Sequence, residues 1–256
     1  MRTCTCIHVV LRRVKKYISD NHLLSPGDRV LVCVSGGSDS VALLDILMRG
    51  GYECVVANCN FHLRGKESNR DSFFVRALAH DLPERLSVRK DWLKDGIPCY
   101  SQDFDTTSYA QEHHLSIETA ARELRYQWFD QIARQTGCKA IAVAHHQNDQ
   151  AETVLMHIRR GCGLQGLCGM RPKAPNPCVE SDIPIIRPLL CTTHDYICHY
   201  LRDIRHIDWV EDSTNSDTRY KRNAIREELS HWTKAEIEHI AALAERVQTA
   251  LTNNEV

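Results

Sequence analysis

The sequence has no long apolar run, few aromatic residues and almost no net charge. None of its segments reaches the roughly 18 consecutive apolar residues that a membrane span needs, which excludes a transmembrane protein. Aromatic residues make up only 7% of the 256 residues, but hydrophobic residues make up 43% and charged residues 25%. This balance excludes disordered and collagen-like chains. The formal net charge of −1 argues against a protein that binds nucleic acid through its whole surface.

Metal-binding cysteine motifs are also missing, although the chain has 12 cysteines. No C-x-x-C pair occurs, and neither Cys4 with Cys6 nor Cys54 with Cys59 has the spacing of a metal site. The sequence therefore predicts no zinc or iron–sulfur site built from cysteines. No secretory segment precedes them, and a chain of this length can build a core without disulfides. We expect reduced thiols and a cytoplasmic protein.

Strand and helix patterns alternate along much of the chain. Short apolar runs predict strands at 28–34, 54–60 and 139–144, with a weaker candidate at 85–89. Helical periodicity predicts helices at 41–48, 117–135 and 149–158. Strands that alternate with helices indicate an α/β fold with a doubly wound parallel sheet.

The ends of the chain differ from this alternating region. Met1–Ile18 is basic, and its apolar spacing favours a first amphipathic helix over a transit peptide. Five of the eight prolines lie within Pro172–Pro188, which predicts an irregular loop or boundary rather than a core element. We therefore expect the regular core to end near residue 190, giving one domain over 1–190 and a small, mainly helical extension over 191–256.

A glycine- and serine-rich turn, SGGSDS, follows the first predicted strand and leads into a helix. Gly36 and Gly37 permit backbone conformations that a Cβ would forbid, and the first amides of the helix, with its dipole, form a binding site for phosphate. The hydroxyls of Ser35, Ser38 and Ser40 add donors. The Walker pattern G-x-x-x-x-G-K-S/T is missing, which argues against a conventional P-loop NTPase. A serine-capped turn without a ligand is the alternative interpretation.

A second polar segment follows the third predicted strand. Because the carboxyl ends of parallel strands meet at one edge of a sheet, we expect His145 and Asp149 to lie near Asp39. Asp149 and Glu152 share a helix face, an arrangement typical of a Mg²⁺ site; for Glu152 the alternative is a solvated acid in the first helical turn. The pair His145-His146 has no third ligand at metal spacing, which argues against zinc.

Positive charge gathers in the middle of the chain. Residues 122–173 contain eight Lys or Arg against four acidic residues, a local charge of +4. This pattern suits a site for phosphates, with a solvated basic surface as the alternative. Glu118 and Arg122 have the i,i+4 spacing of a helix-stabilising pair. The G-x-G-x-x-G pattern at 161–166 follows a predicted helix rather than a strand, which excludes a dinucleotide fingerprint; with Arg159 and Arg160 beside it, the loop either closes over a nucleotide or only ends the helix.

Together these segments resemble the tRNA(Ile)-lysidine synthase family, a branch of the ATP pyrophosphatases in the PP-loop superfamily. Its SGGxDS loop is present as residues 35–40, and the resemblance covers residues 28–226. The other matching segments are Asn60–Gly65, Ala121–Tyr126, Ala144–Asp149, Ala151–Leu155, Arg160–Gly163, Gly166–Met170, Arg187–Leu190, Asp212–Asn215 and Arg222–Arg226. The loop alone indicates only the superfamily, whereas the later segments point to this branch.

The resemblance implies an ATP-dependent carbon–nitrogen ligase with a Rossmann-like sheet of the adenine-nucleotide α-hydrolase type. In such a reaction the C2 carbonyl oxygen of the wobble cytidine, in a tRNA(Ile) with anticodon CAU, attacks the α-phosphate of ATP and releases pyrophosphate. The ε-amine of free L-lysine then displaces AMP and gives lysidine. Many members carry further C-terminal domains that bind the tRNA acceptor arm. Here the resemblance implies a catalytic core plus one helix, and a homodimer is compatible with it.

The resemblance also implies roles for individual residues. The nucleotide would be bound by Ser35, Gly36, Gly37, Ser38, Asp39, Ser40, Arg160, Gly161 and Gly163. Mg²⁺ would be held by Asp39, Asp149 and Glu152, and the first two are also candidates for handling the lysine amine. The activated base or phosphate would be contacted by Arg122, Arg125 and His145.

Two other functions compete with this one. A tRNA thiolase of the same superfamily would need a cysteine pair for a persulfide or a cluster, and the missing C-x-x-C argues against it. A non-catalytic nucleotide-binding module would use the SGGSDS loop but would need no second acidic site at the same edge.

Overall fold

A mostly parallel six-stranded sheet forms the centre of the computed structural model, which describes residues 3–62, 65–85, 93, 96–211, 225, 227–229 and 231–254. The strand order is β3-β2-β1-β4-β6-β5, and β5 alone runs antiparallel to its neighbour. The strands are β1 (Arg29–Cys33), β2 (Glu53–Asn60), β3 (Cys99–Asp103), β4 (Ala140–Ala142), β5 (Lys173–Ala174) and β6 (Ile185–Ile186). The order along the chain reverses between β1 and β4, and in such sheets ligands bind outside the carboxyl ends of the strands at that point.

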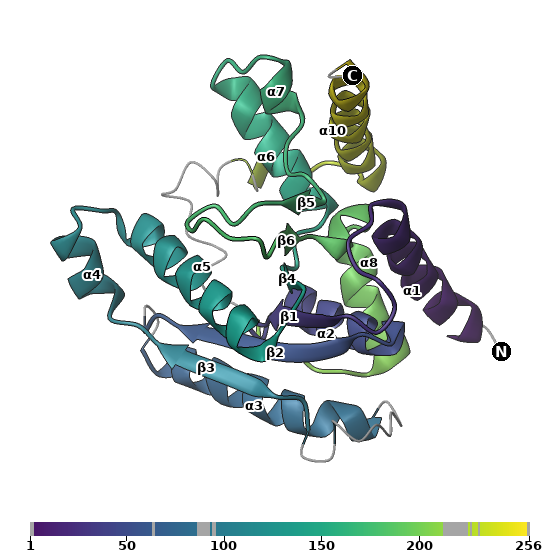
Figure 1. Cartoon of the computed structure of the whole chain (residues 1–256). Helices are drawn as coiled ribbons and strands as arrows, with labels where there is room; N and C mark the ends of the chain where they lie inside the picture. Colours follow the sequence, from purple (N-terminus) through teal and green to yellow (C-terminus); the bar gives the residue numbers. More distant parts are fainter. Residues whose placement is uncertain are drawn as a thin grey trace.

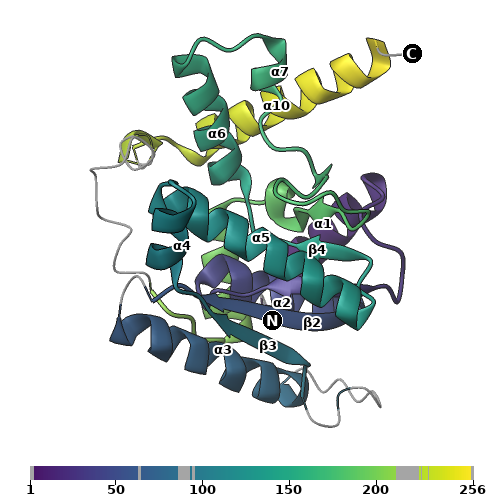
Figure 2. The same cartoon turned by 60° about the vertical axis from the view of Figure 1, so that its left-hand side comes forward.

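Helices cover both faces of the sheet and extend beyond one edge of it (Figure 1). They are α1 (Thr3–Asp20), α2 (Ser38–Gly50), α3 (Lys66–Arg85), α4 (Thr106–Glu112), α5 (Ile117–Thr136), α6 (Gln147–Arg159), α7 (Leu164–Leu167), the 3-10 helix η2 (Pro188–Cys191), α8 (His194–His199), the π-helical η3 (Tyr200–Arg205) and α10 (Lys234–Asn254). The turned view in Figure 2 shows α6, α7 and α10 grouped away from the sheet. The doubly wound α/β fold is thus confirmed.

Alternate residues of the strands point into two different cores, as the period of a strand requires. Val30 and Val32 of β1 belong to a core that also contains residues of α1, α2, α3, α8 and η3. Leu31, between them, packs with α5 on the other face. Since the central strands are buried on both sides, their runs are continuously apolar, which is why the sequence pattern revealed them.

The third strand and the end of the core differ from the sequence prediction. Arg85 is the last residue of α3, and 86–89 lie outside the described residues, whereas the strand β3 is at Cys99–Asp103. The proline-rich segment is also part of the sheet, because β6 pairs with β4 and both of its isoleucines are fully buried. Residues of α8 and η3 belong to the main core, so the core continues past residue 190. The division into 1–190 and 191–256 itself stays a prediction.

Two further points concern membrane-spanning helices and the part of the chain that is described. Among the described residues, no helix is long and apolar enough to cross a membrane. The segment 212–224, which carries most of the last two motifs of the resemblance, and residues 63–64 lie outside the described part of the chain.

Candidate active site at the carboxyl edge of the sheet

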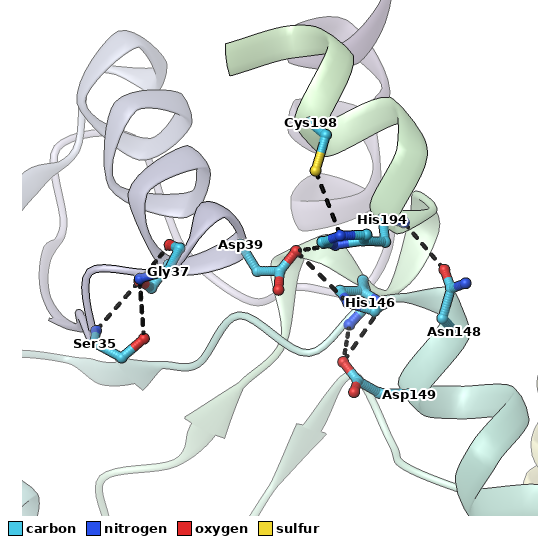
Figure 3. Close-up of polar contacts among 9 residues, drawn as sticks. Ser35, Gly37, Asp39, His146, Asn148, Asp149, His194 and Cys198 are labelled. Carbon is cyan, nitrogen blue, oxygen red and sulfur yellow. Dashed lines mark hydrogen bonds and ion pairs between the residues drawn. The ribbon is translucent and has the colours of Figure 1, made fainter. Parts of the chain in front are cut away.

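The SGGSDS turn is shaped by its own hydrogen bonds. Ser40 Oγ donates to the carbonyl of Gly37 at 2.9 Å and accepts from the amide of Ser35 at 3.2 Å. The amide of Gly37 donates to Ser35 Oγ at 3.4 Å, and these two residues lie side by side in Figure 3. Gly36 has a φ of +96°, in the region that favours glycine, and its carbonyl accepts from the amide of Val210 at 2.9 Å. The Ser40 hydroxyl, expected to be a phosphate donor, therefore supports the turn.

The N-terminus of α2 faces the same edge and has no side-chain cap. Gly37 is the N-cap residue, and no side chain bonds to the first amides of the helix. Unsatisfied N–H groups at the end of a 13-residue helix, together with its dipole, form a site for an anionic group. This geometry agrees with the phosphate site that the sequence predicts.

Asp39, in the first turn of α2, is the centre of a polar cluster (Figure 3). Its Oδ1 atom lies 2.9 Å from Nδ1 of His194 and 3.6 Å from Nε2 of His146. Burial alone would raise the pKa of Asp39, but the bonds and charges of the two histidines outweigh it and hold this pKa well below its usual range. The hydrogen bond to Asp39 raises the pKa of His194 to about 10, and a contact of its Nε2 with Cys198 adds to the shift.

His146 stands between two carboxylates. Its Nε2 faces Asp39, and its Nδ1 lies 3.5 Å from Oδ2 of Asp149. Asp149 also caps α6, because Oδ2 accepts from the backbone amide of His146 at 3.0 Å. Desolvation opposes charge on Asp149, yet His146, His145 and this amide keep its pKa below the usual value. Asp39 and Asp149 thus share one edge, as expected, with an imidazole ring separating them.

Sequence reasoning missed His194, which is brought to the site by contacts around the start of α8. The amide of His194 donates to Oδ1 of Asn148 at 3.0 Å, and the amide of Gln147 donates to the carbonyl of Thr192 at 2.9 Å. These bonds fasten the beginning of α8 to the beginning of α6. His194 lies 155 residues after Asp39, so no local pattern could have shown the contact.

The three carboxylates expected to hold Mg²⁺ do not assemble as one set. Glu152 is 2% exposed and lies inside α6, beyond the first turn of the helix. Among the described residues, one group of three or more potential metal ligands has its atoms within 4.8 Å of one another, and it consists of Asp39, His146 and His194. Asp149 instead faces Nδ1 of His146, the ring nitrogen that does not face Asp39.

Two arginines of α5, Arg122 and Arg125, lie against aromatic rings. The guanidinium of Arg125 is 5.1 Å from the ring centroid of Phe61, just after β2, and the Phe61 ring stacks on Phe104. Arg122 lies over Tyr126 of its own helix, 5.0 Å from the centroid. These contacts fix both guanidinium groups beside aromatic rings. Their contact with a base or phosphate stays a prediction, as does that of His145.

The structure does not bring Arg160, Gly161 and Gly163 to the SGGSDS turn. Arg160 ends α6, and a helix of 13 residues is about 20 Å long, whereas His146 lies at its other end. Arg159 forms an ion pair with Glu228. The assignment of this loop to the nucleotide stays a prediction.

Comparison with known sequences gives one family and consistent relatives. The profile described as the PP-loop domain matches residues 7–233. The tRNA(Ile)-lysidine synthase of Bacteroides thetaiotaomicron is 48% identical over 218 residues, covering 85% of this chain and 46% of that protein. The protein of the same name from Geobacter sulfurreducens is 37% identical, covering 90% of this chain and 45% of its own length. The chain spans less than half the length of these two relatives.

Solved structures show the same fold at low identity. The U34-tRNA thiolase NcsA from Methanococcus maripaludis, solved with its iron–sulfur cluster, superposes with a TM-score of 0.68 at 16% identity, covering 96% of this chain and 80% of that one. The NMN synthetase from Francisella tularensis gives a TM-score of 0.52 at 12% identity, with coverages of 94% and 93%. At these identities the likeness concerns the fold alone.

Proposed function

We propose, from the premise that this chain belongs to the PP-loop family, that it catalyses the ATP-dependent attachment of L-lysine to the wobble cytidine of a tRNA(Ile) with anticodon CAU. Two relatives named tRNA(Ile)-lysidine synthase, 48% and 46% identical over 85% of the chain, support this choice within the family. The observation that carries the proposal is the meeting of the uncapped α2 N-terminus, Asp39 and Asp149 at one edge of the sheet.

Two bond exchanges make up the proposed reaction. The C2 oxygen of cytidine attacks the α-phosphorus of ATP, and the bond to the β-phosphate oxygen breaks to release pyrophosphate. The lysine ε-ammonium gives one proton to water and becomes a nucleophilic amine. Its nitrogen then bonds to C2, AMP leaves with the original oxygen, and the nitrogen releases a second proton to water. The amides at the start of α2 would orient the pyrophosphate, and the carboxylate of Asp149 would hold the lysine ammonium. Positioning and charge complementarity account for most of the catalysis.

Mg²⁺ fits this site as an ion that arrives with ATP. Mg²⁺ is commonly held by one or two carboxylates together with substrate phosphates. Asp39 can serve as that carboxylate, because it lies beside the phosphate-binding turn and is about a third exposed, at 31%. Asp149 is not in the ligand group of Asp39, His146 and His194, and its share in holding the ion stays a prediction. When bound, Mg²⁺ would offset the negative charge of the phosphates.

The tRNA would approach the same edge. Single-stranded anticodon loops present bases that stack on aromatic or guanidinium planes, and Arg125, held on Phe61, offers such a plane. Because tRNA is the proposed substrate, we place the reaction in the cytoplasm. That the protein forms a homodimer stays a prediction.

Incubation with ATP, Mg²⁺, lysine and tRNA(Ile) transcripts tests the proposal. We expect pyrophosphate release that depends on tRNA, and a wobble nucleoside whose mass has increased by one lysine residue. A control without lysine should still release pyrophosphate but leave no lysine on the nucleoside. Release of pyrophosphate in the complete reaction, with no lysine found on the wobble nucleoside, would contradict the lysidine assignment while keeping the adenylation step.

The thiolase alternative lacks support from the described residues. The group of potential metal ligands among these residues contains no cysteine. The described cysteines from Cys33 to Cys198 are free thiols. A 16% identical thiolase structure adds only a shared fold. A sulfur-containing wobble nucleoside in the same mass analysis would favour this alternative.

A further inference from the structure

We propose that Asp39, His146 and His194 form a binding site for one divalent transition metal ion of the zinc and cobalt type. The sequence argued against zinc because the His145-His146 pair has no third ligand nearby. The fold supplies that ligand, since His194 reaches Asp39 from α8 (Figure 3). The three donors come from three different elements, α2, the N-cap of α6 and α8.

The distances agree with a shared ion. Ligands bound to zinc at about 2.0–2.1 Å lie about 3.3 Å from each other in a tetrahedron. Asp39 Oδ1 lies 2.9 Å from His194 Nδ1 and 3.6 Å from His146 Nε2, and all three donor atoms are within 4.8 Å of one another. Small side-chain rotations therefore suffice to admit a metal.

Each histidine also has a polar neighbour at its second ring nitrogen, although Nδ1 of His146 makes no hydrogen bond. His146 Nδ1 faces Asp149 at 3.5 Å, and His194 Nε2 faces Cys198 Sγ at 3.4 Å. In metal sites the second ring nitrogen usually has such a partner, which fixes the tautomer and the direction of the ring. Cys198 fits this role for His194, whereas Asp149 is an ion-pair neighbour of His146.

The donor types select the class of metal. Mg²⁺ prefers oxygen ligands, whereas imidazole suits zinc, cobalt, nickel and iron. Three protein ligands leave positions for water or a substrate oxygen. The side chain of His194 is 43% exposed and that of Asp39 31%, so these positions open toward the edge where the α2 N-terminus binds anions. The ion and the phosphates would thus be neighbours.

Cobalt titration of the purified chain, without nucleotide, lysine or tRNA, tests the site. We expect visible ligand-field bands that saturate at one Co²⁺ per chain and disappear when Zn²⁺ is added. His194→Gln should weaken binding strongly, because loss of an outer partner alone costs about 10–100-fold in affinity, and loss of a ligand should cost no less. Cys198→Ser should give a smaller reduction.

A matched control separates this site from adventitious histidines. His199 lies on the same helix, is half-exposed and pairs with Asp203 at 2.7 Å, so His199→Gln should keep the wild-type affinity and spectrum. Wild-type binding by His194→Gln, or no saturable Co²⁺ binding by the native chain, would overturn the proposal. Because no reaction is measured, a negative result here leaves the proposed ligase activity untouched, and the converse also holds.

Discussion

Replacing Asp45 by Asn should be among the most destabilising single changes in the sheet-covering helices. Asp45 lies on α2 with no exposed surface. Its carboxylate accepts a hydrogen bond from the Tyr200 hydroxyl and bonds at 3.1–3.2 Å from Nε and Nη2 of Arg205, and Arg49 lies 3.4 Å away. Removing one partner of a buried pair leaves the other charge unpaired and costs about 3–5 kcal/mol.

This loss is large compared with total stability. Domains unfold with a free energy of about 5–15 kcal/mol, and 1 kcal/mol shifts the Tm of a chain of this size by about 2–4 °C. Asp45→Asn should therefore lower the Tm by about 6–20 °C. Tyr200→Phe removes one hydrogen bond to a charged acceptor, worth about 1.5–3 kcal/mol, and keeps the arginine contacts. The two variants should rank in that order.

Urea unfolding followed by far-UV circular dichroism and tryptophan fluorescence measures both changes. Asp203→Asn is the control on the same helical segment, because its pair with His199 is exposed and should be worth less than about 1 kcal/mol. Equal unfolding midpoints for Tyr200→Phe and Asp203→Asn would refute the reasoning. If the two probes separate in Tyr200→Phe alone, η3 unfolds apart from the sheet, contrary to its place in the main core.

The same network predicts the response to alkaline pH. Burial, and then the charge of Asp45, raises the pKa of Tyr200. Because the folded-state pKa exceeds the unfolded value of about 10, the folded state holds its proton longer, and stability declines as the pH rises above that value. Below pH 10 the contribution is complete. Tyr200→Phe should show a shallower decline between pH 10 and 11 in the same unfolding assay.

Three further predictions concern the proposed reaction. Asp39→Asn should lower pyrophosphate release at least about 100-fold with little change in Tm. Asp149→Asn should lower lysine attachment while pyrophosphate release continues, again with little change in Tm, because an Asn oxygen can still accept from the amide of His146; near-wild-type rates would contradict either role. Alanine at both Arg159 and Arg160 should flatten the salt dependence of tRNA binding, and an unchanged slope would assign them elsewhere. A transcript with uridine at the wobble position should fail to accept lysine, because an acceptor facing the cytosine amino group would meet another acceptor; equal rates would remove the basis for the assignment.

The sequence predicted those strands and helices whose residues carry a local pattern. The buried runs of β1, β2 and β4 and the periodic faces of α2, α5 and α6 were found in this way. The strand β3 was not, because its residues are half-buried or exposed at the edge of the sheet and show no apolar run. The strand β6 is two residues long, too short for any period, and only its pairing with β4 makes it part of the core.

The part of the site that follows the parallel strands was predictable, because the carboxyl ends of neighbouring parallel strands lie at one edge of the sheet. Asp39 follows β1 and Asp149 follows β4, and since the two strands are parallel neighbours, their carboxyl ends coincide. His194 follows no sheet strand directly and depends on the packing of α8 against α2. Contacts between helices that are far apart in the sequence produce no local sequence pattern. His194, the third residue of the group with Asp39 and His146, was therefore found only from the fold.

Two contacts between α2 and the α8–η3 segment have the same sequence separation. Asp39 meets His194, and six residues further along both elements Asp45 meets Tyr200, each across 155 residues. Equal offsets mean that the two elements run side by side in the same direction, with both N-termini at the carboxyl edge of the sheet. The contact between Asp45 and Tyr200 is buried, and it lies about 9 Å further along α2 than the contact between Asp39 and His194. The buried pair therefore sets the distance between Asp39 and His194, and Tyr200→Phe should weaken cobalt binding although it touches no proposed ligand. Unaltered cobalt affinity in that variant would show that the bonds between the beginnings of α6 and α8 suffice to position His194.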